Sequence, residues 1–190
     1  MAGFKPVRYR DGSPYNGAAQ RCSYVTAADL YVGDVVASSG TADAAGVIGV
    51  SLAGETAAVY GVVVGFEPIV SDLSSNYITS AQATSTTTPT FVLVATDKNI
   101  IYHCKEDGTG GFLTADEVGE NTNSTAGTPV TAYGASGHVL DSSDQNTTAT
   151  LQFKLLGLAQ TPGNDYGTTS TVWEVAINQS EAHGLGTLGT

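Results

Sequence analysis

Short runs of β-branched and aromatic residues recur along this chain, separated by glycine, proline and small polar residues. Helix formers with a period of 3.6 residues are scarce, and the best helical candidate, "TADEVGE" at 114–120, is short and interrupted by Gly119. Short strands between frequent turns are typical of sandwiches and barrels. The pattern predicts an all-β fold, an antiparallel β-barrel or sandwich with long loops and an extended N-terminal arm.

The clearest strand signal lies at 57–70, where Val62, Val64 and Phe66 alternate with Gly61, Val63 and Gly65. The glycines are expected to leave one face bare, so that another backbone or a large side chain can approach closely. Further strands are expected around 34–37, within 46–56, around 130–133, within 149–160 with a β-bulge before Gly157, and within 170–180.

The segment 91–111 combines two β-rich runs around "TDKN" and is interpreted as a hairpin. The alternation predicts that Ile100, Tyr102 and Cys104 face the core while His103 lies on the outer face. In the last strand, Trp173, Val175 and Ile177 are expected to share one face.

The organisation along the chain follows from where these signals stop. Residues 1–22 contain Pro6, Pro14 and several glycines without a strand period, and are interpreted as an extended arm. Residues 23–180 form the β domain, in which the polar stretch 71–90 is a linker or a surface excursion. Residues 181–190 are interpreted as a flexible tail.

Charge is distributed unevenly along the 190 residues, whose formal net charge is −11. Residues 1–21 hold four basic residues and one acid, a net of +3, whereas 22–190 hold three lysines and seventeen acids, a net of −14. The strong negative charge of residues 22–190, the body of the chain, disfavours binding to nucleic acid or anionic lipid. The mean hydropathy is close to zero, no apolar run reaches the roughly 18 residues of a membrane helix, and no apolar region follows the N-terminal charges as in a signal peptide. A basic arm on this body could bind the acidic surface of a neighbour, although an ordinary charged tail would have the same composition.

No metal or cofactor site is expected. His103, His138 and His183 are not at metal-ligand spacing, and two cysteines cannot form a structural zinc site. Cys22 and Cys104 either pair across a long loop or remain two buried thiols, and the sequence leaves both readings open.

No catalytic motif is complete in the sequence. "GASGH" at 134–138 brings Ser136 near His138 but does not match the G-x-S-x-G pattern of a nucleophile elbow. Glu67 and Glu174 are the least loop-like candidates for a glycosidase pair, yet nothing in the sequence brings them together. The chain is therefore predicted not to be an enzyme.

Five segments, taken in order, carry a resemblance to a known family. They are "GSPYNGAAQRCSY", "YVGDVV", "VYGVVVGFEP", "TDKNIIYHCKED" and "LLGLAQTPGNDYGTTSTVWEVAIN". With the polar stretches between them, the chain resembles the head decoration, or capsid cement, proteins of tailed bacteriophages. The resemblance implies a protein made in the host cytoplasm that binds the outer capsid surface of the virion as a homotrimer and bridges subunits of the major capsid protein.

Under this resemblance the arm would lie on a capsid subunit or a sister copy. Basic residues would bind acidic surface and tyrosines would add amphipathic contact area; these residues are Lys5, Arg8, Tyr9, Arg10, Tyr15 and Arg21. The alternative is a tail, neck or fibre-associated module that binds host glycans through Tyr77, Tyr133 and Tyr166.

Overall fold

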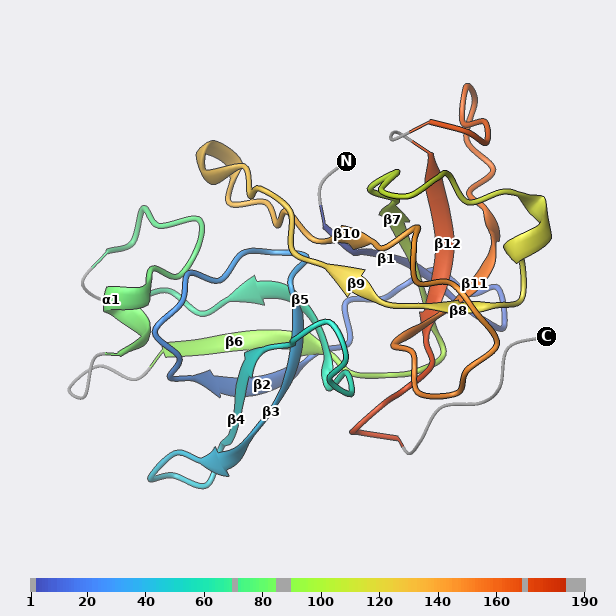
Figure 1. The fold of residues 1–190 in the computed structure, drawn as a ribbon. Helices are drawn as coiled ribbons and strands as arrows, with labels where there is room; N and C mark the ends of the chain where they lie inside the picture. The colour runs from blue at the N-terminus through green and yellow to red at the C-terminus, as the bar shows by residue number, and fades with distance from the viewer. Residues whose placement is uncertain (1–2, 70–71, 85–89, 169–170, 184–190) are drawn as a thin grey trace.

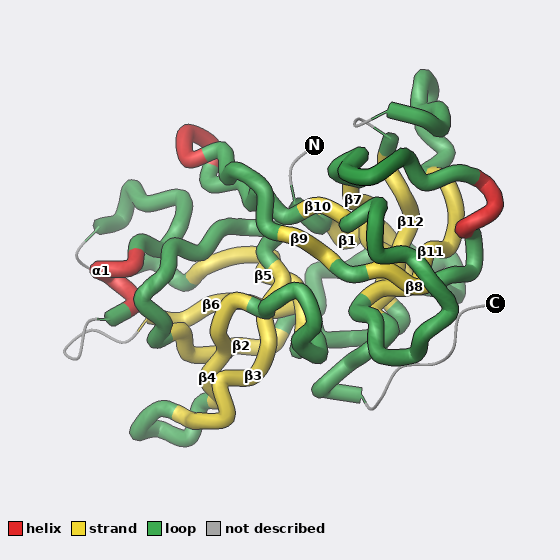
Figure 2. Tube along the Cα trace, in the orientation of Figure 1, coloured by secondary structure: helices red, strands yellow, loops and turns green. Residues whose placement is uncertain are grey.

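The computed structural model describes residues 3–69, 72–84, 90–168 and 171–183, and it confirms the all-β prediction. Strands and loops make up nearly all of this part of the chain (Figure 1, Figure 2). The strands are β1 (Lys5–Tyr9), β2 (Gln20–Tyr24), β3 (Val35–Ala42), β4 (Ile48–Leu52), β5 (Gly61–Phe66), β6 (Thr90–Ala95), β7 (Ile100–Lys105), β8 (Asn121–Thr122), β9 (Ser124–Thr125), β10 (Val139–Leu140), β11 (Phe153–Leu158) and β12 (Val172–Ile177). Three short helical segments accompany them, α1 (Ser80–Ala83), η1 (Ala115–Glu117) and η2 (Thr131–Tyr133).

One half of the molecule is a closed barrel with the strand order β2-β4-β3-β5-β6, on the left in Figure 1. Its pairs are antiparallel except for the parallel pair of β2 with β4. The barrel encloses a core of its own, to which Tyr24, Val36, Val50 and Val92 contribute. Every residue of that core lies between positions 22 and 94, so the barrel is built from one contiguous stretch of chain.

The other half is an antiparallel five-stranded sheet with the order β1-β7-β12-β11-β8, on the right in Figure 1. Trp173, Val175 and Ile177 are buried in its core together with Ile100, Tyr102 and Cys104, as their alternation predicts. This second core also takes Val35, Val62 and Ala95 from the barrel strands. The two halves therefore share buried surface.

Strand β5 shows how one element serves both halves. Val62 is buried in the core of the five-stranded sheet, and Val63 is buried in the barrel core. The pairing register of β5 with β6 shifts between Val63 and Gly65, so Phe66 packs on the same core as Val63 rather than on that of Val62. The predicted alternation holds for Val62 and Val64, which lie against the same core, and is wrong for Phe66, because the bulge reverses the phase.

The close approach predicted for the glycines holds for Gly61 only. A Cβ at Gly61 would lie within 3 Å of both the carbonyl oxygen of Ala95 and Cγ1 of Val94, whereas a Cβ at Gly65 would meet Leu93 at an ordinary 3.6 Å. Strands β5 and β6 thus pack closely at the start of β5 and not at its end.

The predicted hairpin at 91–111 is wrong. Both strands exist, but β6 pairs with β2 and β5 in the barrel, and β7 pairs with β1 and β12 in the sheet. A strand has only two edges for hydrogen bonding, and in each case both are occupied by other partners. Residues 96–99 consequently carry the chain from the barrel to the sheet.

The N-terminal segment is extended, as predicted, but it lies on its own chain. Lys5–Tyr9 forms β1 at the edge of the sheet, and Phe4 is buried, with its ring stacked 4.4 Å from that of Phe153. Pro6, which has no N–H group to donate, is accommodated on an edge strand. The next strand already begins at Gln20, so the boundary placed at residue 22 falls within β2.

The remaining predictions concern β11, the segment 130–133, the two cysteines and the C-terminal segment. The β-bulge before Gly157 is confirmed by a register shift between Leu155 and Gly157. The short strand expected at 130–133 is the 3-10 helix η2 instead. Cys22 and Cys104 are both free and buried, in different cores, which decides between the two readings of the cysteines. Of the predicted tail, residues 184–190 lie outside the described part, while the backbone N–H of Glu181 donates to Val59.

Candidate interaction surface

The outer face of the five-stranded sheet gathers basic side chains. Antiparallel partners point to the same side of a sheet, and the register pairs Lys5 with His103, Arg8 with Ile101, and Val172 with Lys105. Since Ile100, Tyr102 and Cys104 point into the core, Lys5, Arg8, His103 and Lys105 lie on the opposite, outer face. On β11, Lys154 pairs with Ala176 and joins this face.

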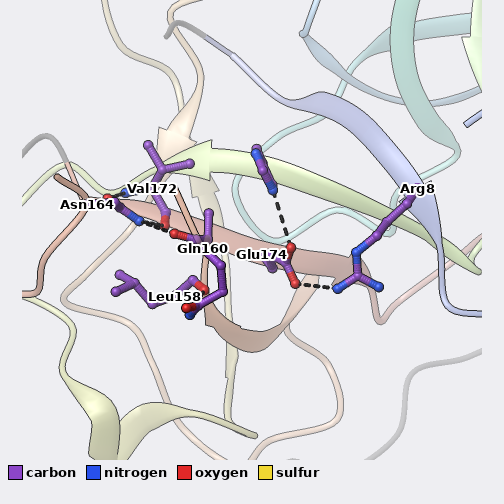
Figure 3. Close-up of polar contacts among 8 residues, drawn as sticks. Arg8, Leu158, Gln160, Asn164, Val172 and Glu174 are labelled. Carbon is purple, nitrogen blue, oxygen red and sulfur yellow. Dashed lines mark hydrogen bonds and ion pairs between the residues drawn. The ribbon is translucent and has the colours of Figure 1, made fainter. Parts of the chain in front are cut away.

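Glu174 lies at the centre of the basic face. Its Oε2 accepts a hydrogen bond from the Arg8 guanidinium at 2.7 Å, and its Oε1 lies 3.4 Å from Nε2 of His103 (Figure 3). Because the Glu174 and Arg8 side chains are 18% and 39% exposed, the pair is only partly shielded from water. The carboxylate holds Arg8 across β7 and fixes the arrangement of the face.

The charge balance of this basic face is opposite to that of the chain. Among the described strand residues of the sheet, this face carries four cations, Lys5, Arg8, Lys105 and Lys154, and one carboxylate, Glu174, while the whole chain has a net charge of −11. A cationic face on an acidic molecule directs encounters with acidic surfaces and opposes approach in other orientations.

The six residues expected to form a contact arm separate into four places. Lys5 and Arg8 lie on the basic face. Tyr9 and Tyr15 lie near each other on the core side, with ring centroids 6.0 Å apart, and are half-buried. Arg10 is exposed beyond the end of β1, where its N–H donates to Asn99.

Arg21 belongs to the barrel. Its guanidinium lies 3.4 Å above the ring of Phe91 and forms a bidentate pair with Glu67. The other carboxylate considered for a glycosidase pair, Glu174, is held by Arg8 in the sheet. The two acids are thus engaged in separate ion pairs in different halves of the molecule.

Ser136 and His138 belong to a buried cluster with Asp34. The Oγ of Ser136 accepts from the backbone N–H of His138 at 2.9 Å, and Nδ1 of the imidazole accepts from the N–H of Val35 at 3.4 Å. The carboxylate of Asp34 accepts from the N–H of Tyr31 and from the Ser136 side chain. These bonds hold the loop before β10 against the barrel.

Burial shifts both titratable groups of this cluster toward their neutral forms. Burial raises the pKa of Asp34, and this rise is partly counteracted by the charge of His138 and by the hydrogen bonds to the carboxylate. Burial lowers the pKa of His138, and this fall is partly counteracted by the charge of Asp34. Glu106 is a second buried carboxyl with a raised pKa, again chiefly through burial, and it accepts from the N–H of Leu113 and the indole of Trp173. Both carboxyls link separate segments of the chain.

A groove of about 460 Å³ opens where the barrel meets the sheet. Its lining is mostly apolar or aromatic and includes Phe4, Tyr15, Val32, Val64 and Tyr133, and Lys5 also belongs to it. Tyr133 on η2 is 83% exposed. Of the other tyrosines considered for glycan binding, Tyr77 stacks on Tyr31, and the ring of Tyr166 packs in a tilted contact against that of Trp173.

Within the described residues, no group of three or more His, Cys, Asp or Glu side chains is arranged to hold a metal ion. None of the helices in that part of the chain has the length and apolar character to cross a bilayer.

Comparison with protein-family models, with curated proteins and with solved structures finds no match to this chain.

Sequence reasoning located two members of the basic face, Lys5 and Arg8, and missed Lys105, Lys154 and Glu174. Charge clustering along the chain marked the first two, since they are close in sequence. The others come from β7, β11 and β12, and only the strand order places them beside β1. In the sequence, Lys105 and Lys154 each alternate with core-facing residues of their strands, and this alternation was the signal that could have placed them on the outer face.

Proposed function

We propose that this chain is a structural protein of a tailed-bacteriophage particle, which decorates the outer surface of the head and cements neighbouring subunits of the major capsid protein. The observation that carries the proposal is the basic face of the sheet on an otherwise acidic molecule. The all-β fold and the ordered resemblance of five segments to decoration proteins support it. On this proposal the chain acts by binding and not by catalysis.

The basic face suits docking to an acidic coat surface for physical reasons. Long-range attraction raises the association rate and orients the molecule, and the dissociation rate then depends on contacts made after docking. Each contact can be weak if many copies bind one lattice, because a copy that bridges two subunits binds the second at high effective concentration. A sheet supported by a buried core also loses little conformational entropy on binding.

Binding of the purified protein to density-purified particles from which it has been removed tests the proposal. The double variant Arg8→Gln with Lys105→Gln removes two charges from the basic face. The matched control, Arg10→Gln with Lys98→Gln, removes the same two charge types outside that face. We expect at least about a tenfold loss of affinity for the first and about twofold or less for the second.

Raising the salt concentration should weaken binding of the wild type more than binding of the basic-face variant. Equal binding of the two double variants would contradict docking through the basic face. Failure of the wild type to bind such particles, together with its absence from virions by quantitative mass spectrometry, would contradict the proposed function itself.

A further inference from the structure

One amide in the connection between β1 and β2 differs from the other asparagine side chains of the chain. Asn16 is the only asparagine in the sequence that is followed by glycine. It is exposed, and Gly17 has a positive φ of 83°. Apart from its chain neighbours, no atom of the described residues lies within 4 Å of the position that a Cβ on Gly17 would occupy. The peptide nitrogen of Gly17 is therefore not shielded by a side chain of its own residue or by a packed neighbour.

Two donors hold the side-chain oxygen of Asn16. The backbone N–H of Ala18 donates to Oδ1 at 3.0 Å, and the Tyr9 hydroxyl donates to it at 2.9 Å. The first bond forms the turn in which an asparagine oxygen accepts from the N–H two residues later. This turn folds the side chain back along the Gly17 peptide, and both donors polarise the carbonyl group.

The nitrogen of the same amide is placed differently. Within the described part of the chain, Nδ2 of Asn16 has no hydrogen-bond partner. Loss of this nitrogen would therefore break no contact of the fold. The donor on Tyr9 is held in position, since the Tyr9 ring lies against that of Tyr15 with centroids 6.0 Å apart.

We propose that Asn16 is a site of spontaneous deamidation, which the Tyr9 hydroxyl and the Ala18 N–H promote. Solvent hydroxide removes the proton of the Gly17 N–H, and the nitrogen forms a bond to Cγ of Asn16 while the carbonyl electron pair moves to Oδ1. The oxyanion then receives hydrogen bonds from the two donors that Oδ1 already has, as in the tetrahedral intermediates of acyl transfer. The bond from Cγ to Nδ2 breaks, Nδ2 takes a proton from water and leaves as ammonia, and a cyclic succinimide remains.

Water opens the succinimide at either of its two carbonyl carbons. Attack at Cγ restores the normal backbone with aspartate at position 16, and attack at the main-chain carbon gives isoaspartate. The overall change consumes one water and releases one ammonia. Either product lowers the net charge of residues 1–21 from +3 to +2. Isoaspartate also lengthens the backbone next to Tyr15, which lines the groove of about 460 Å³.

The other asparagines lack this combination of features and serve as internal references. Asn164 precedes Asp165, and both ends of its amide are engaged: Nδ2 donates to the carbonyls of Ala159 and Val172, and Oδ1 accepts from the N–H of Val172 (Figure 3). Three further asparagines are buried, namely Asn121, Asn123 and Asn178. The inference does not depend on the proposed function.

Incubation of the full chain at neutral pH tests the proposal, with peptide mass spectrometry to measure conversion at each asparagine and circular dichroism to verify folding. We expect Asn16 to convert at least about tenfold faster than any other asparagine, and Gly17→Ala to slow it at least about tenfold, because a Cβ then shields the nitrogen. Both aspartate and isoaspartate should form at position 16.

Two tyrosine variants separate the effect of the donors from that of the Asn-Gly sequence. Tyr9→Phe keeps the ring and removes the hydroxyl, and it should slow conversion about threefold, less than in a buried site because water screens the exposed oxyanion. The matched control is Tyr15→Phe, since the Tyr15 hydroxyl donates to the carbonyl of Ala18 at 2.9 Å and not to Asn16. This variant should convert at the wild-type rate.

Three results would overturn the proposal. The first is an Asn16 that keeps its amide while other asparagines convert. The second is equal conversion in the Tyr9 and Tyr15 variants, which would leave the donors without a role. The third is formation of aspartate without isoaspartate, which would exclude the succinimide.

Discussion

Gln152 offers the sharpest test of how the two halves of the molecule are held together. Its side chain is fully buried and makes four hydrogen bonds. Nε2 donates to the carbonyl oxygens of Gly54 and Ala57 at 2.8 and 2.9 Å, in the connection between β4 and β5 of the barrel. Oε1 accepts from the N–H and the hydroxyl of Ser124 in β9, both at 2.8 Å. One amide therefore joins the barrel, β9 and the chain leading into β11.

The cost of Gln152→Ala follows from these four bonds. A typical hydrogen bond contributes about 1 kcal/mol net, and a buried partner left without a bond costs about 1–3 kcal/mol. Four bonds give about 4 kcal/mol, and water entering the space vacated by the side chain can satisfy some of the remaining partners. We expect the free energy of unfolding to fall by about 3–5 kcal/mol, at the upper end of single substitutions.

Urea unfolding monitored by tryptophan fluorescence is a suitable assay, because the chain has one tryptophan, Trp173, and it is buried. The matched control is Gln160→Ala. Gln160 is exposed and its amide donates to Leu158 within its own hairpin (Figure 3), so its loss should cost about 0.5 kcal/mol or less. If Gln152→Ala cost no more than the control, the amide would not be a principal link between the halves.

Gln152→Glu separates hydrogen bonding from packing. The carboxylate keeps two acceptors for Ser124 but places an acceptor against the carbonyls of Gly54 and Ala57. Destabilisation comparable to that of the alanine variant is expected at neutral pH, with partial recovery in acid, where a protonated carboxyl can donate one bond. If the stability of the Gln152→Glu variant did not recover in acid, this assignment of donors and acceptors would be contradicted.

Three other predictions concern buried or partly buried titratable side chains. Glu106→Gln should lower the free energy of unfolding by about 1–3 kcal/mol, because the new NH₂ group must face a backbone N–H or the indole of Trp173; urea titration measures this, and wild-type stability would contradict it. Burial alone would raise the pKa of Asp107, but hydrogen bonds from Thr109 and Ser142 lower it below 3.8, so its contribution should persist at neutral pH and be lost as the pH falls below that value. The stability gap between wild type and Asp107→Asn should therefore narrow in acid, and a gap independent of pH would contradict the assignment. Burial raises the pKa of Cys22 to about 11 and that of Cys104 further, so neither thiol should react with a disulfide reagent at pH 8 until the protein is unfolded, and rapid labelling of the native protein would refute this.

Strand identity and strand faces could be predicted from the sequence where a strand is long and one of its faces is buried. Trp173, Val175 and Ile177 alternate with polar or small residues, and they lie in the core as expected. The prediction failed where a bulge changes the phase, as in β5 after Val63. A bulge adds one residue to one strand, so a strict period of two no longer describes it.

Pairing between strands could not be predicted from local signals. "TDKN" between two β-rich runs favours a hairpin, yet each run has its neighbours elsewhere in the chain. Strand β1 was missed for a related reason: its register shifts between Pro6 and Arg8, which removes the alternation from an already short strand. The burial of Phe4 compensates for the weak strand signal, and a single aromatic residue near a terminus does not reveal its partner.

The same limits apply to the candidate surfaces. A cluster of basic residues within 21 positions was visible in the sequence, but its division between the sheet face and the barrel depends on strand order. The groove of about 460 Å³ joins residues 32, 64 and 133, which are far apart in the sequence. Exposure of Tyr133 was anticipated, whereas the groove beside it requires the tertiary structure.

The contiguity of the barrel has a consequence for biosynthesis. Its strands and its core lie between positions 20 and 95, so the ribosome delivers everything the barrel needs before it delivers β7. The sheet instead combines β1 from the start of the chain with β12 near residue 177, and β1 has no strand to join until more than ninety further residues have been made. Long-range pairings of this kind form slowly. The order of synthesis therefore favours closure of the barrel first, and during that interval Phe4 and the basic residues of β1 remain accessible to chaperones, proteases or a premature partner.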